Sequence, residues 1–379
     1  MRPPLPFGQP NFSDREIDAV TRVMRSGWVG MGPETEAFEH ELAAAIGVDH
    51  VVAVDSCTSA LLLSLVVQGV GPGDEVVCPS LTWCSTANVA LHLGASVVFC
   101  DIDPDSLCAG LPQISAALSP RTKAVLPVHF GGRAVDVAAL RAGLPPTVAI
   151  VEDAAHAFGA RLPDGRMVGA SGAPTCFSFY ANKVISTADG GAIALPDGDI
   201  AQHLCALRVH GLSRQPWQRV GNPREALAAT PLSELGYKAN YTDLQAAIGR
   251  VQLARQAEFS ATRHAVADVY LRGLAGRGFG LQQGSGSADH AHHLFLVLLP
   301  HPLKDRRAAI MTRMRERGIG VTVHYPPLHR MPLYARDGAP PLLPVTDDIA
   351  DRIMTLPIGP CMGVDDAQWV VDTLLELSA

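Results

Sequence analysis

The chain has 379 residues, of which 47% are hydrophobic and 18% are charged, a composition typical of a globular protein and not of a disordered one. This length exceeds what one ordinary core organises and therefore predicts two domains. The formal net charge of −7 argues against a nucleic-acid or anionic-membrane partner, so an anionic ligand would need a local binding site.

The N-terminal segment and the cysteines favour the cytoplasm. Residues 1–12, MRPPLPFGQPNF, have prolines where an export signal needs an apolar core. The most apolar stretch, ALLLSLVVQGV at 60–70, is too short to span a bilayer. The 8 cysteines include no C-x-x-C pair, and several lie in strand-like runs, which suits a reducing compartment better than a disulfide framework or a zinc site.

Short β-branched runs alternate with helical stretches between residues 50 and 195. Predicted strands lie at 50–56, 74–79, 95–103, 122–130, 147–156, 175–180 and 190–195. This alternation is typical of an α/β fold with a mostly parallel sheet covered by helices on both faces. Ligands bind such sheets at the carboxyl ends of the strands, where the sequence places Thr58, Ser59, Trp83, Asp153, His156 and Lys183.

The C-terminal part of the chain has a different pattern. Residues 211–240 have mixed charge and little apolar periodicity, and we expect a long surface loop. A helix is predicted to begin near Thr242-Asp243 and to lead into a smaller α+β region. We therefore predict a large domain over residues 1–245, including the N-terminal segment, and a small domain over residues 246–379.

The stretch VDSCTSALLLSL predicts a strand, a turn of small residues and a helix that opens at Thr58-Ser59. A helix start offers free backbone N–H groups and partial positive charge, which suit a phosphate. The alternative is that Ser56 or Thr58 simply caps the helix. The stretch by itself does not decide between the two.

Asp153 ends a predicted strand in IVEDAAHAFGA, and His156 lies about one helical turn further on. Three interpretations are open: a metal pair, a buried Asp–His hydrogen bond, and a carboxylate that pairs with a protonated ring nitrogen beside a stacking residue. We see no third metal ligand with recognisable spacing, so we predict no metal site. Trp83 is either a core aromatic residue or a cover for such a ring.

Lys183 follows the aromatic strand FSFY, in FSFYANKVIST. A lysine there either lays its stem over the surface or supplies an amine for chemistry. Ser178, on the strand before it, could add a hydroxyl to a phosphate site. A phosphate turn, a carboxylate, stacking residues and a lysine are together the parts of a pyridoxal phosphate site.

The order of these parts resembles the DegT/DnrJ/EryC1/StrS family of sugar aminotransferases. The similar stretches cover nearly the whole chain and include SGWVGMGPETEAFE, GPGDEVVCPSLTWCSTANVALHLGA, IVEDAAHAFGA, FSFYANK, LGYKANYTDLQAAIG and HYPPLH. The resemblance implies the aspartate aminotransferase-like fold of type I pyridoxal phosphate enzymes. It also implies a homodimer with shared active sites.

The resemblance also implies residue roles. Lys183 would form the Schiff base with the cofactor, and Asp153 would pair with its ring nitrogen. Some relatives that act as dehydratases have histidine at the lysine position, so Lys183 argues against that activity. Trp83 and His156 would flank the cofactor ring. Its phosphate would be bound by Thr58, Ser59 and Ser178.

The loop that precedes the Thr242 helix would reach the partner subunit's cofactor phosphate. Asn240 is the first candidate for this contact and Lys238 the second. The sequence departs from the family pattern at Cys57, where relatives often have glycine or alanine, and at Ala239, where close relatives tend to have an aromatic residue. Cys57 would crowd the phosphate turn, and Ala239 leaves the register of the loop open.

The implied reaction moves an amino group from an amino acid, with L-glutamate expected, to a nucleotide-linked keto sugar. The stretches SGWVGMGPE, SLTWCST and GYKANYTD look most like the branch that aminates C4 of UDP-linked sugars, such as the 4-amino-4-deoxyarabinose enzyme. We expect His324 near the sugar, and Arg214, Trp217 and Lys238 at the nucleotide. The alternatives are a 3-keto sugar aminotransferase, a non-catalytic protein on the same fold, and a metal hydrolase that uses His129, Asp153 and His156.

Overall fold

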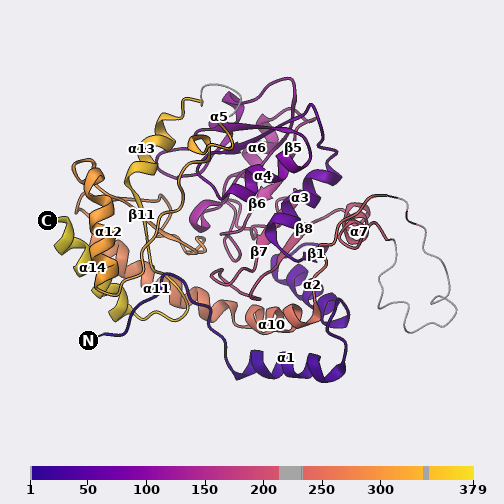
Figure 1. The fold of residues 1–379 in the computed structure, drawn as a ribbon, viewed down its shortest axis with the longest axis horizontal. Coiled ribbons are helices and arrows are strands. Elements are labelled where there is room, and N and C mark those ends of the chain that lie inside the picture. Colours follow the sequence, from indigo (N-terminus) through magenta and orange to yellow (C-terminus); the bar gives the residue numbers. More distant parts are fainter. Residues whose placement is uncertain (1, 213–231, 233, 336–340) are drawn as a thin grey trace.

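The computed structural model describes residues 2–212, 232, 234–335 and 341–379. A larger α/β region holds the central strands, and a smaller layer of helices and strands lies beside it, next to both chain termini (Figure 1). The helices α10 (Asp243–Ala254) and α11 (Gln256–Leu274) run from one region to the other.

The larger region is built on two 4-stranded sheets with the orders β3-β2-β4-β5 and β1-β8-β7-β6. Their members are β1 (His50–Val54), β2 (Glu75–Pro79), β3 (Ser96–Cys100), β4 (Thr122–Val125), β5 (Ala149–Ile150), β6 (Glu152–Asp153), β7 (Thr175–Ser178) and β8 (Gly191–Leu195). The strands β5 and β6 are interrupted only at Val151, so the two sheets are continuous. Every neighbouring pair is parallel except those of β8, which is antiparallel to β1 and β7.

Both faces of this sheet are buried. In β1, Val51 and Ala53 belong to one apolar cluster, and Val52 and Val54 belong to another. Successive side chains of a strand point to opposite faces, so a fully apolar strand needs cover on both sides. The helices of this region are α1 (Asp14–Ser26), α2 (Pro33–Ile46), α3 (Cys57–Val67), α4 (Cys84–His92), α5 (Leu111–Ala116), α6 (Val137–Gly143) and α7 (Gly198–Leu207), and a 3₁₀ turn, η1, covers Phe130–Gly132. The predicted α/β fold class is confirmed.

The C-terminal region has its own antiparallel sheet in the order β11-β10-β9. It comprises β9 (Gly280–Leu281), β10 (Phe295–Leu298), η2 (His301–Arg306), α12 (Arg307–Glu316), η3 (Leu328–Arg330), α13 (Pro344–Arg352), β11 (Ile353–Leu356) and α14 (Val364–Ser378). A separate apolar cluster, which includes Tyr270, Phe295 and Val370, fills it. The expected division after residue 245 falls within α10, and this boundary stays a prediction.

The expected helix start at Thr242-Asp243 is the start of α10. Thr242 is the N-cap residue, and its side chain accepts a hydrogen bond from the Gln245 backbone N–H. The carboxylate of Asp243 accepts hydrogen bonds from the backbone N–H groups of Gly32 and Thr35, at 2.8 and 3.0 Å. Since α2 begins at Pro33, this buried carboxylate also stabilises the start of that helix.

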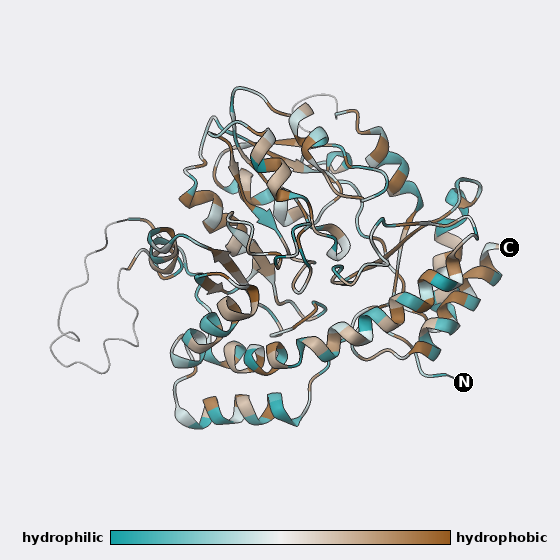
Figure 2. Ribbon diagram, turned by 180° about the vertical axis from the view of Figure 1, so that it is seen from behind, coloured by the Kyte–Doolittle hydropathy of each residue, from teal (hydrophilic) through white to brown (hydrophobic). Residues whose placement is uncertain are grey.

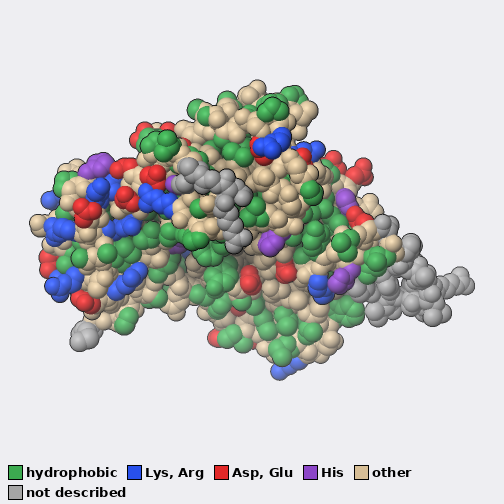
Figure 3. Space-filling model, turned by 45° about the horizontal axis from the view of Figure 1, so that its top comes forward, with side chains coloured by type: hydrophobic (Ala, Val, Ile, Leu, Met, Phe, Trp, Pro, Cys, Tyr) green, Lys and Arg blue, Asp and Glu red, His purple; other side chains and the backbone are tan. Residues whose placement is uncertain are grey.

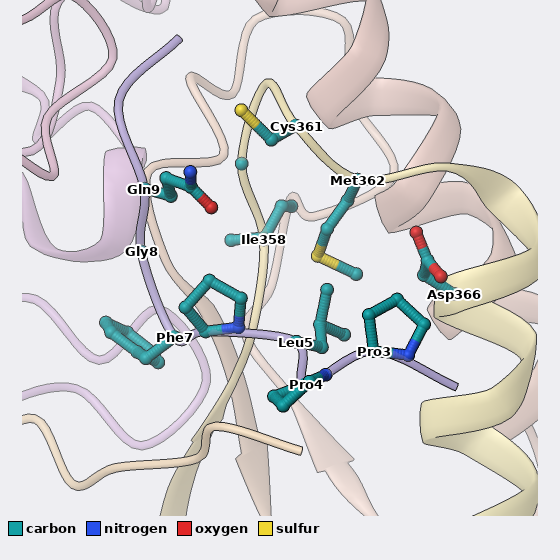
Figure 4. Close-up of a pocket in the computed structure, with 12 residues that line it drawn as sticks. Pro3, Pro4, Leu5, Phe7, Gly8, Gln9, Ile358, Cys361, Met362 and Asp366 are labelled. Atoms are coloured by element: carbon teal, nitrogen blue, oxygen red, sulfur yellow. The ribbon is translucent and has the colours of Figure 1, made fainter. Parts of the chain in front are cut away.

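The N-terminal segment lies along the small region (Figure 4). Leu5 forms a parallel bridge with Ile319. Its N–H donates a hydrogen bond to Gly318 O, and its C=O accepts one from Gly320 N, each at 2.8 Å. Beside it lies a small cavity of about 170 Å³, whose lining includes Pro3, Phe7, Ile358, Met362 and Asp366. The start of the chain thus links the two regions.

The distribution of polarity fits these layers. The strands at the centre are mostly hydrophobic, and hydrophilic residues lie along the outer helices (Figure 2). On the face shown in Figure 3, acidic and basic side chains are interspersed over the small region. None of the helices in the described part of the chain is long and apolar enough to cross a membrane.

Helix α1 is fixed to the body of the protein through the buried carboxylate of Glu16. Glu16 accepts hydrogen bonds from the N–H of Ser13 at 2.8 Å, from Gln252 Nε2 at 2.7 Å and from Arg255 Nη1 at 2.9 Å. Burial by itself would raise the pKa of Glu16, but the hydrogen bonds from Ser13, Gln252 and Arg255 lower it to about 2. The charged form of Glu16 is therefore the one that the fold stabilises.

Because the pKa of Glu16 is lower in the folded chain than in the unfolded chain, its contribution to stability is present above pH 4.5 and is lost as the pH falls toward 2. We expect Glu16→Gln to remove about 2 kcal/mol of the free energy of unfolding at pH 7, and less at pH 3. Denaturant unfolding measured from pH 7 to pH 3 checks this. The control Asp18→Asn changes an exposed carboxylate on the same helix and should keep the wild-type pH dependence. Equal losses for Glu16→Gln at both pH values would contradict the assignment.

Candidate active site

A cleft of about 500 Å³ opens at the carboxyl ends of the central strands. It brings together residues from distant parts of the sequence, because parallel strands end at the same edge of a sheet. Seven of the predicted site residues line it: Thr58, Trp83, Asp153, His156, Ser178, Lys183 and His324. The sequence did not single out the other polar lining residues, which include Thr82, Ser85, Tyr180, Asn182, Asp189 and Tyr325.

The start of α3 forms one end of the cleft. Ser56 is the N-cap residue, and its hydroxyl accepts a hydrogen bond from Ser59 N at 3.1 Å, so the capping alternative is realised by Ser56. Thr58 lines the cleft and donates a hydrogen bond to Ser85 Oγ at 2.9 Å. The N–H groups in the first turn of a helix have no partner within the helix. The same helix start is therefore both capped and able to bind an anion.

Strand β8 approaches this turn very closely at Gly191. A Cβ atom on Gly191 would lie 2.5 Å from the carbonyl carbon of Ser56 and 2.6 Å from the nitrogen of Cys57. Any larger residue would therefore displace the turn. The Cys57 thiol, expected to crowd the turn, lies 3.7 Å from the Cys176 carbonyl oxygen.

Asp153 ends β6 and is only 6% exposed. Its Oδ2 accepts a hydrogen bond from Thr86 Oγ1 at 2.7 Å, and its Oδ1 accepts one from Ala155 N at 3.1 Å. The Thr86 hydroxyl in turn lies 2.9 Å from that of Thr82. These contacts orient the carboxylate in the cleft. Thr86 was not predicted, but the spacing of Thr82 and Thr86 by one helical turn in LTWCSTAN could have indicated it.

The ring of His156 is held by partners other than Asp153. Its Nδ1 accepts a hydrogen bond from Gly131 N at 3.4 Å, and its Nε2 lies 3.1 Å from the Tyr325 hydroxyl. Since Nδ1 is an acceptor, the proton of the neutral ring is assigned to Nε2. Burial, with Lys183 and His324 nearby, lowers the pKa of His156 well below its usual value, so the ring is neutral.

His129 has a structural role. It is fully buried, its Nε2 lies 2.8 Å from Glu152 Oε2, and its Nδ1 accepts a hydrogen bond from Val135 N at 2.9 Å. Both ring nitrogens are therefore engaged. Within the described ranges, no group of three His, Cys, Asp or Glu side chains could hold a metal ion.

Lys183 lies in the segment between β7 and β8, and its amine faces the cleft. Its Nζ is 3.4 Å from His293 Nε2, at the long end of the hydrogen-bonding range. Burial lowers the pKa of Lys183 to about 8, although Cys57 and Asp153 act in the opposite direction. His293, two residues before β10 in HHLFLVLL, was not among the residues predicted from the sequence.

Aromatic residues form the outer part of the cleft. Trp83 is 59% exposed, so it is not a core residue, and its ring centroid lies 5.6 Å from that of Tyr325. The Tyr325 ring is nearly parallel to that of His156, at an interplanar angle of 24°. His324 is buried, with Nδ1 2.9 Å from Thr355 Oγ1 and its ring 5.2 Å from that of Phe7. The N-terminal segment thus contacts the site.

The remaining predicted residues lie elsewhere. Lys238 and Asn240 line a separate hollow with residues 27–31 and Val209, and Lys238 Nζ donates a hydrogen bond to Asn240 Oδ1. Ser59 is not among the residues that line the cleft. Arg214 and Trp217, together with most of the expected 211–240 loop, are outside the described residues.

The groups in the cleft fit pyridoxal phosphate. A helix start suits its phosphate, a fixed buried carboxylate suits its ring nitrogen, and an amine with a lowered pKa suits its carbonyl carbon. Asn182, next to Lys183, has a buried Oδ1 without a hydrogen-bond partner among the described residues. A buried oxygen of this kind indicates that a bound molecule completes the site.

Comparisons with known proteins agree with this fit. The profile of the DegT/DnrJ/EryC1/StrS aminotransferase family matches residues 10–375. The structure of DesV from S. venezuelae is similar at a TM-score of 0.89, with 35% identity over 100% of this chain and 99% of that chain. The aminotransferase TlmJ from Streptoalloteichus hindustanus has a TM-score of 0.89 and 32% identity, over 99% and 98% of the two chains.

A third similar structure is the sugar aminotransferase Spr1654 from Streptococcus pneumoniae in its PMP form. It has a TM-score of 0.90 and 27% identity over 99% of this chain and 98% of that chain. The same protein is also known in a PLP form. The chain therefore belongs to the DegT/DnrJ/EryC1/StrS aminotransferase family and is a pyridoxal phosphate-dependent sugar aminotransferase.

Proposed function

We propose that this enzyme transfers an amino group from L-glutamate to C4 of a keto sugar linked to UDP. The observation that carries the proposal is the meeting of the Lys183 amine, the Asp153 carboxylate and the start of α3 in one cleft. Pyridoxal phosphate, when bound, supplies a carbonyl that takes up the amino group and a ring that withdraws electrons from the reacting carbon. The residues of the chain provide the binding, orientation and proton transfer.

Asp153 holds a proton on the ring nitrogen of the cofactor. Its carboxylate is buried and already oriented by Thr86 and the backbone of Ala155, so little reorganisation is needed during the reaction. His156 and Trp83 flank the ring. Thr58, Ser178 and the first turn of α3 bind the phosphate, and Ser59 acts through the hydrogen bond that caps this turn.

Lys183 would hold the cofactor through its amine and would carry the proton that moves during transfer. Only an unprotonated amine is a nucleophile, and burial makes this form accessible near pH 8. The neutral His156 next to it adds no positive charge that would have to be compensated. The cleft thus favours the reactive form of the lysine.

The nucleotide and the sugar bind at the outer part of the cleft. His324 lies beside Tyr325 and contacts the sugar. The diphosphate is bound by basic residues that include Arg214 and, from the separate hollow of the partner subunit, Lys238. Trp217 stacks on the base. The choice of UDP and of C4 rests on the stretches SGWVGMGPE, SLTWCST and GYKANYTD, and amination at C3 is the alternative within the family.

The active unit in this proposal is a homodimer with shared sites. Trp83 and Tyr180 are 59% and 52% exposed at the cleft, and Val29 is 44% exposed beside the hollow that contains Lys238 and Asn240. Exposed large apolar side chains near a site are typical of surfaces that a partner covers. Asn240 from one subunit, or Lys238, would then reach the cofactor phosphate of its partner.

We expect Lys183→Ala to abolish covalent attachment of the cofactor and to lower transfer on the order of a thousandfold or more, because the nucleophile is lost. Borohydride reduction of the holoenzyme, followed by peptide mass spectrometry, should locate the cofactor on Lys183 alone. Lys304→Ala removes an exposed lysine and should match wild type in both measurements. Attachment to another lysine, or normal turnover of Lys183→Ala, would contradict the assigned role.

The substrate assignment predicts turnover with L-glutamate and UDP-4-keto sugars, and a new C–N bond at C4. The assay compares UDP-4-keto, dTDP-4-keto and 3-keto sugar nucleotides, and NMR of the product locates the nitrogen. Amination at C3 would contradict the C4 assignment and indicate the alternative, a 3-keto sugar aminotransferase. Activity on free sugars without a nucleotide would contradict the proposed nucleotide site.

A further inference from the structure

His293 contacts the amine of Lys183, although it is not among the residues that line the cleft. Its Nε2 lies 3.4 Å from Lys183 Nζ, and the side chain is 4% exposed. Its ring centroid is 4.6 Å from that of His156. His293 lies two residues before β10, so this contact joins the small region to the lysine between β7 and β8.

The backbone around His293 is fixed by the larger region. Ala291 N donates to Gly132 O and Leu294 N donates to Gly131 O, each at 3.0 Å. Gly132 has a φ of +112°, and a Cβ atom there would lie 2.9 Å from the nitrogen of His292. A glycine is therefore required for this close approach of the two segments.

Arg263 fixes the same backbone from the small region. This arginine of α11 is 1% exposed, and its Nη1 donates hydrogen bonds to the carbonyl oxygens of His292 and His293, at 3.1 and 3.4 Å. It also bonds Ile358 O at 3.3 Å. Burying a guanidinium is costly, and Nε has no partner among the described residues, so the three bonds from Nη1 are what tie this arginine to the His292–His293 backbone and to Ile358. The imidazole of His293 therefore has little freedom to move away from Lys183.

The ring nitrogens of His293 differ in their surroundings. Nδ1 is buried and has no hydrogen-bond partner among the described residues, whereas Nε2 faces Lys183. A buried N–H without an acceptor is rarer in proteins than a bare acceptor, so the proton is assigned to Nε2. In this tautomer the ring can donate a hydrogen bond only to an amine with a free lone pair. That amine is the unprotonated form of Lys183.

The hydrogen bond from His293 is the specific contact of the Lys183 amine, because the other nearby groups act on it through burial and charge. Asp153 and Cys57 raise the pKa of Lys183, whereas burial lowers it. Burial, together with the nearby Lys183, also lowers the pKa values of His156, His293 and His324, so these rings are neutral. His293 is the one of the three whose ring nitrogen forms a hydrogen bond with Nζ in the described part of the chain.

We propose that His293 donates a hydrogen bond from Nε2 to the unprotonated amine of Lys183, and so holds this amine oriented and reactive whenever it is not bonded to the cofactor. The inference rests on the proposed role of Lys183 as the cofactor lysine. Arg263 acts as a positioning residue in this arrangement, because it reaches the amine only through the backbone of His293.

The test measures the protonation of Lys183 in the apoprotein. Limited reductive methylation with formaldehyde and cyanoborohydride, followed by peptide mass spectrometry, gives the rate at Lys183 from pH 6 to pH 10. We expect the wild-type rate to rise with a midpoint near 8. In His293→Leu the midpoint should move up by about one pH unit, the size of one neutral hydrogen bond. Greater burial of the amine beside leucine would by itself lower the midpoint, so the direction of the shift separates loss of the hydrogen bond from greater burial.

Two further variants complete the test. His293→Gln retains a side-chain N–H donor and should return the midpoint toward that of wild type. His329→Leu removes a buried imidazole from another segment, where it is bonded to Ser80 and Asp347, and it should leave the midpoint unchanged. If His293→Leu does not fold, His293→Asn replaces it, because its amide is too short to reach Nζ, and the same rise is expected.

An unchanged or lowered midpoint in folded His293→Leu would overturn the inference. The proposed function is tested separately by the residue that carries the cofactor in the borohydride-reduced wild-type holoenzyme. If that residue is not Lys183, the proposed role of Lys183 fails, whatever the methylation shows. If it is Lys183 and the midpoint does not rise, only the role of His293 fails.

Discussion

The hydrogen bond from Thr86 to Asp153 fixes the carboxylate around which the cleft is arranged. Asp153 ends β6 in the middle of the sheet, where both of its neighbouring segments are parallel to it. Its N–H donates to Pro127 O at 2.9 Å, and its side chain bonds to the first helical turn of α4. The negative charge of Asp153 is therefore held in the cleft by segments that are far apart in the sequence. The other charges of the site are arranged around it.

Burial determines the protonation of the groups around this carboxylate. The amine of Lys183 has a pKa near 8, and the imidazoles of His156, His293 and His324 are neutral. Desolvation disfavours every cation in the cleft, and Asp153 offsets this effect only partly for the lysine. An amine in such a place loses its proton at a pH where an exposed lysine keeps it. This is what nucleophilic chemistry by a lysine requires.

The sequence predicted the α/β class and seven of the residues that line the cleft, because both depend on local patterns. Runs such as 50–56 and 74–79 contain pairs of β-branched residues, and the polar residues after them lie at one sheet edge. Tyr325 was missed although it adjoins the predicted His324, and the only signal for Thr86 was its spacing from Thr82, since a single sequence does not show which side chain faces the cleft. His293 was missed for a different reason. It reaches Lys183 only through the packing of β10 against the turn at Gly131-Gly132, a long-range contact that no periodicity encodes.

The predicted capping role of the Ser56–Ser59 turn is confirmed and leaves room for the predicted phosphate role. Ser56 caps α3, and the cap directs the first turn of the helix toward the cleft. By contrast, an Asp153–His156 hydrogen bond, one of the interpretations left open by the sequence, does not form, since Thr86 and Tyr325 provide their partners. Short polar side chains compete for many nearby donors, so sequence proximity does not determine their hydrogen bonds.

In the proposed reaction, the enzyme accepts an amino group from L-glutamate and donates it to the keto sugar in the same cleft. The most direct measurement is the visible absorbance of the holoenzyme during stepwise addition of the two substrates. The account predicts that L-glutamate abolishes the absorbance band of the lysine-bound cofactor and releases one equivalent of 2-oxo acid per site, since the amino group stays on the enzyme. A UDP-4-keto sugar added after removal of glutamate should restore the band and yield the amino sugar. A band that does not respond to amino acids, or a glutamate-treated enzyme that no keto sugar nucleotide restores, would contradict the account.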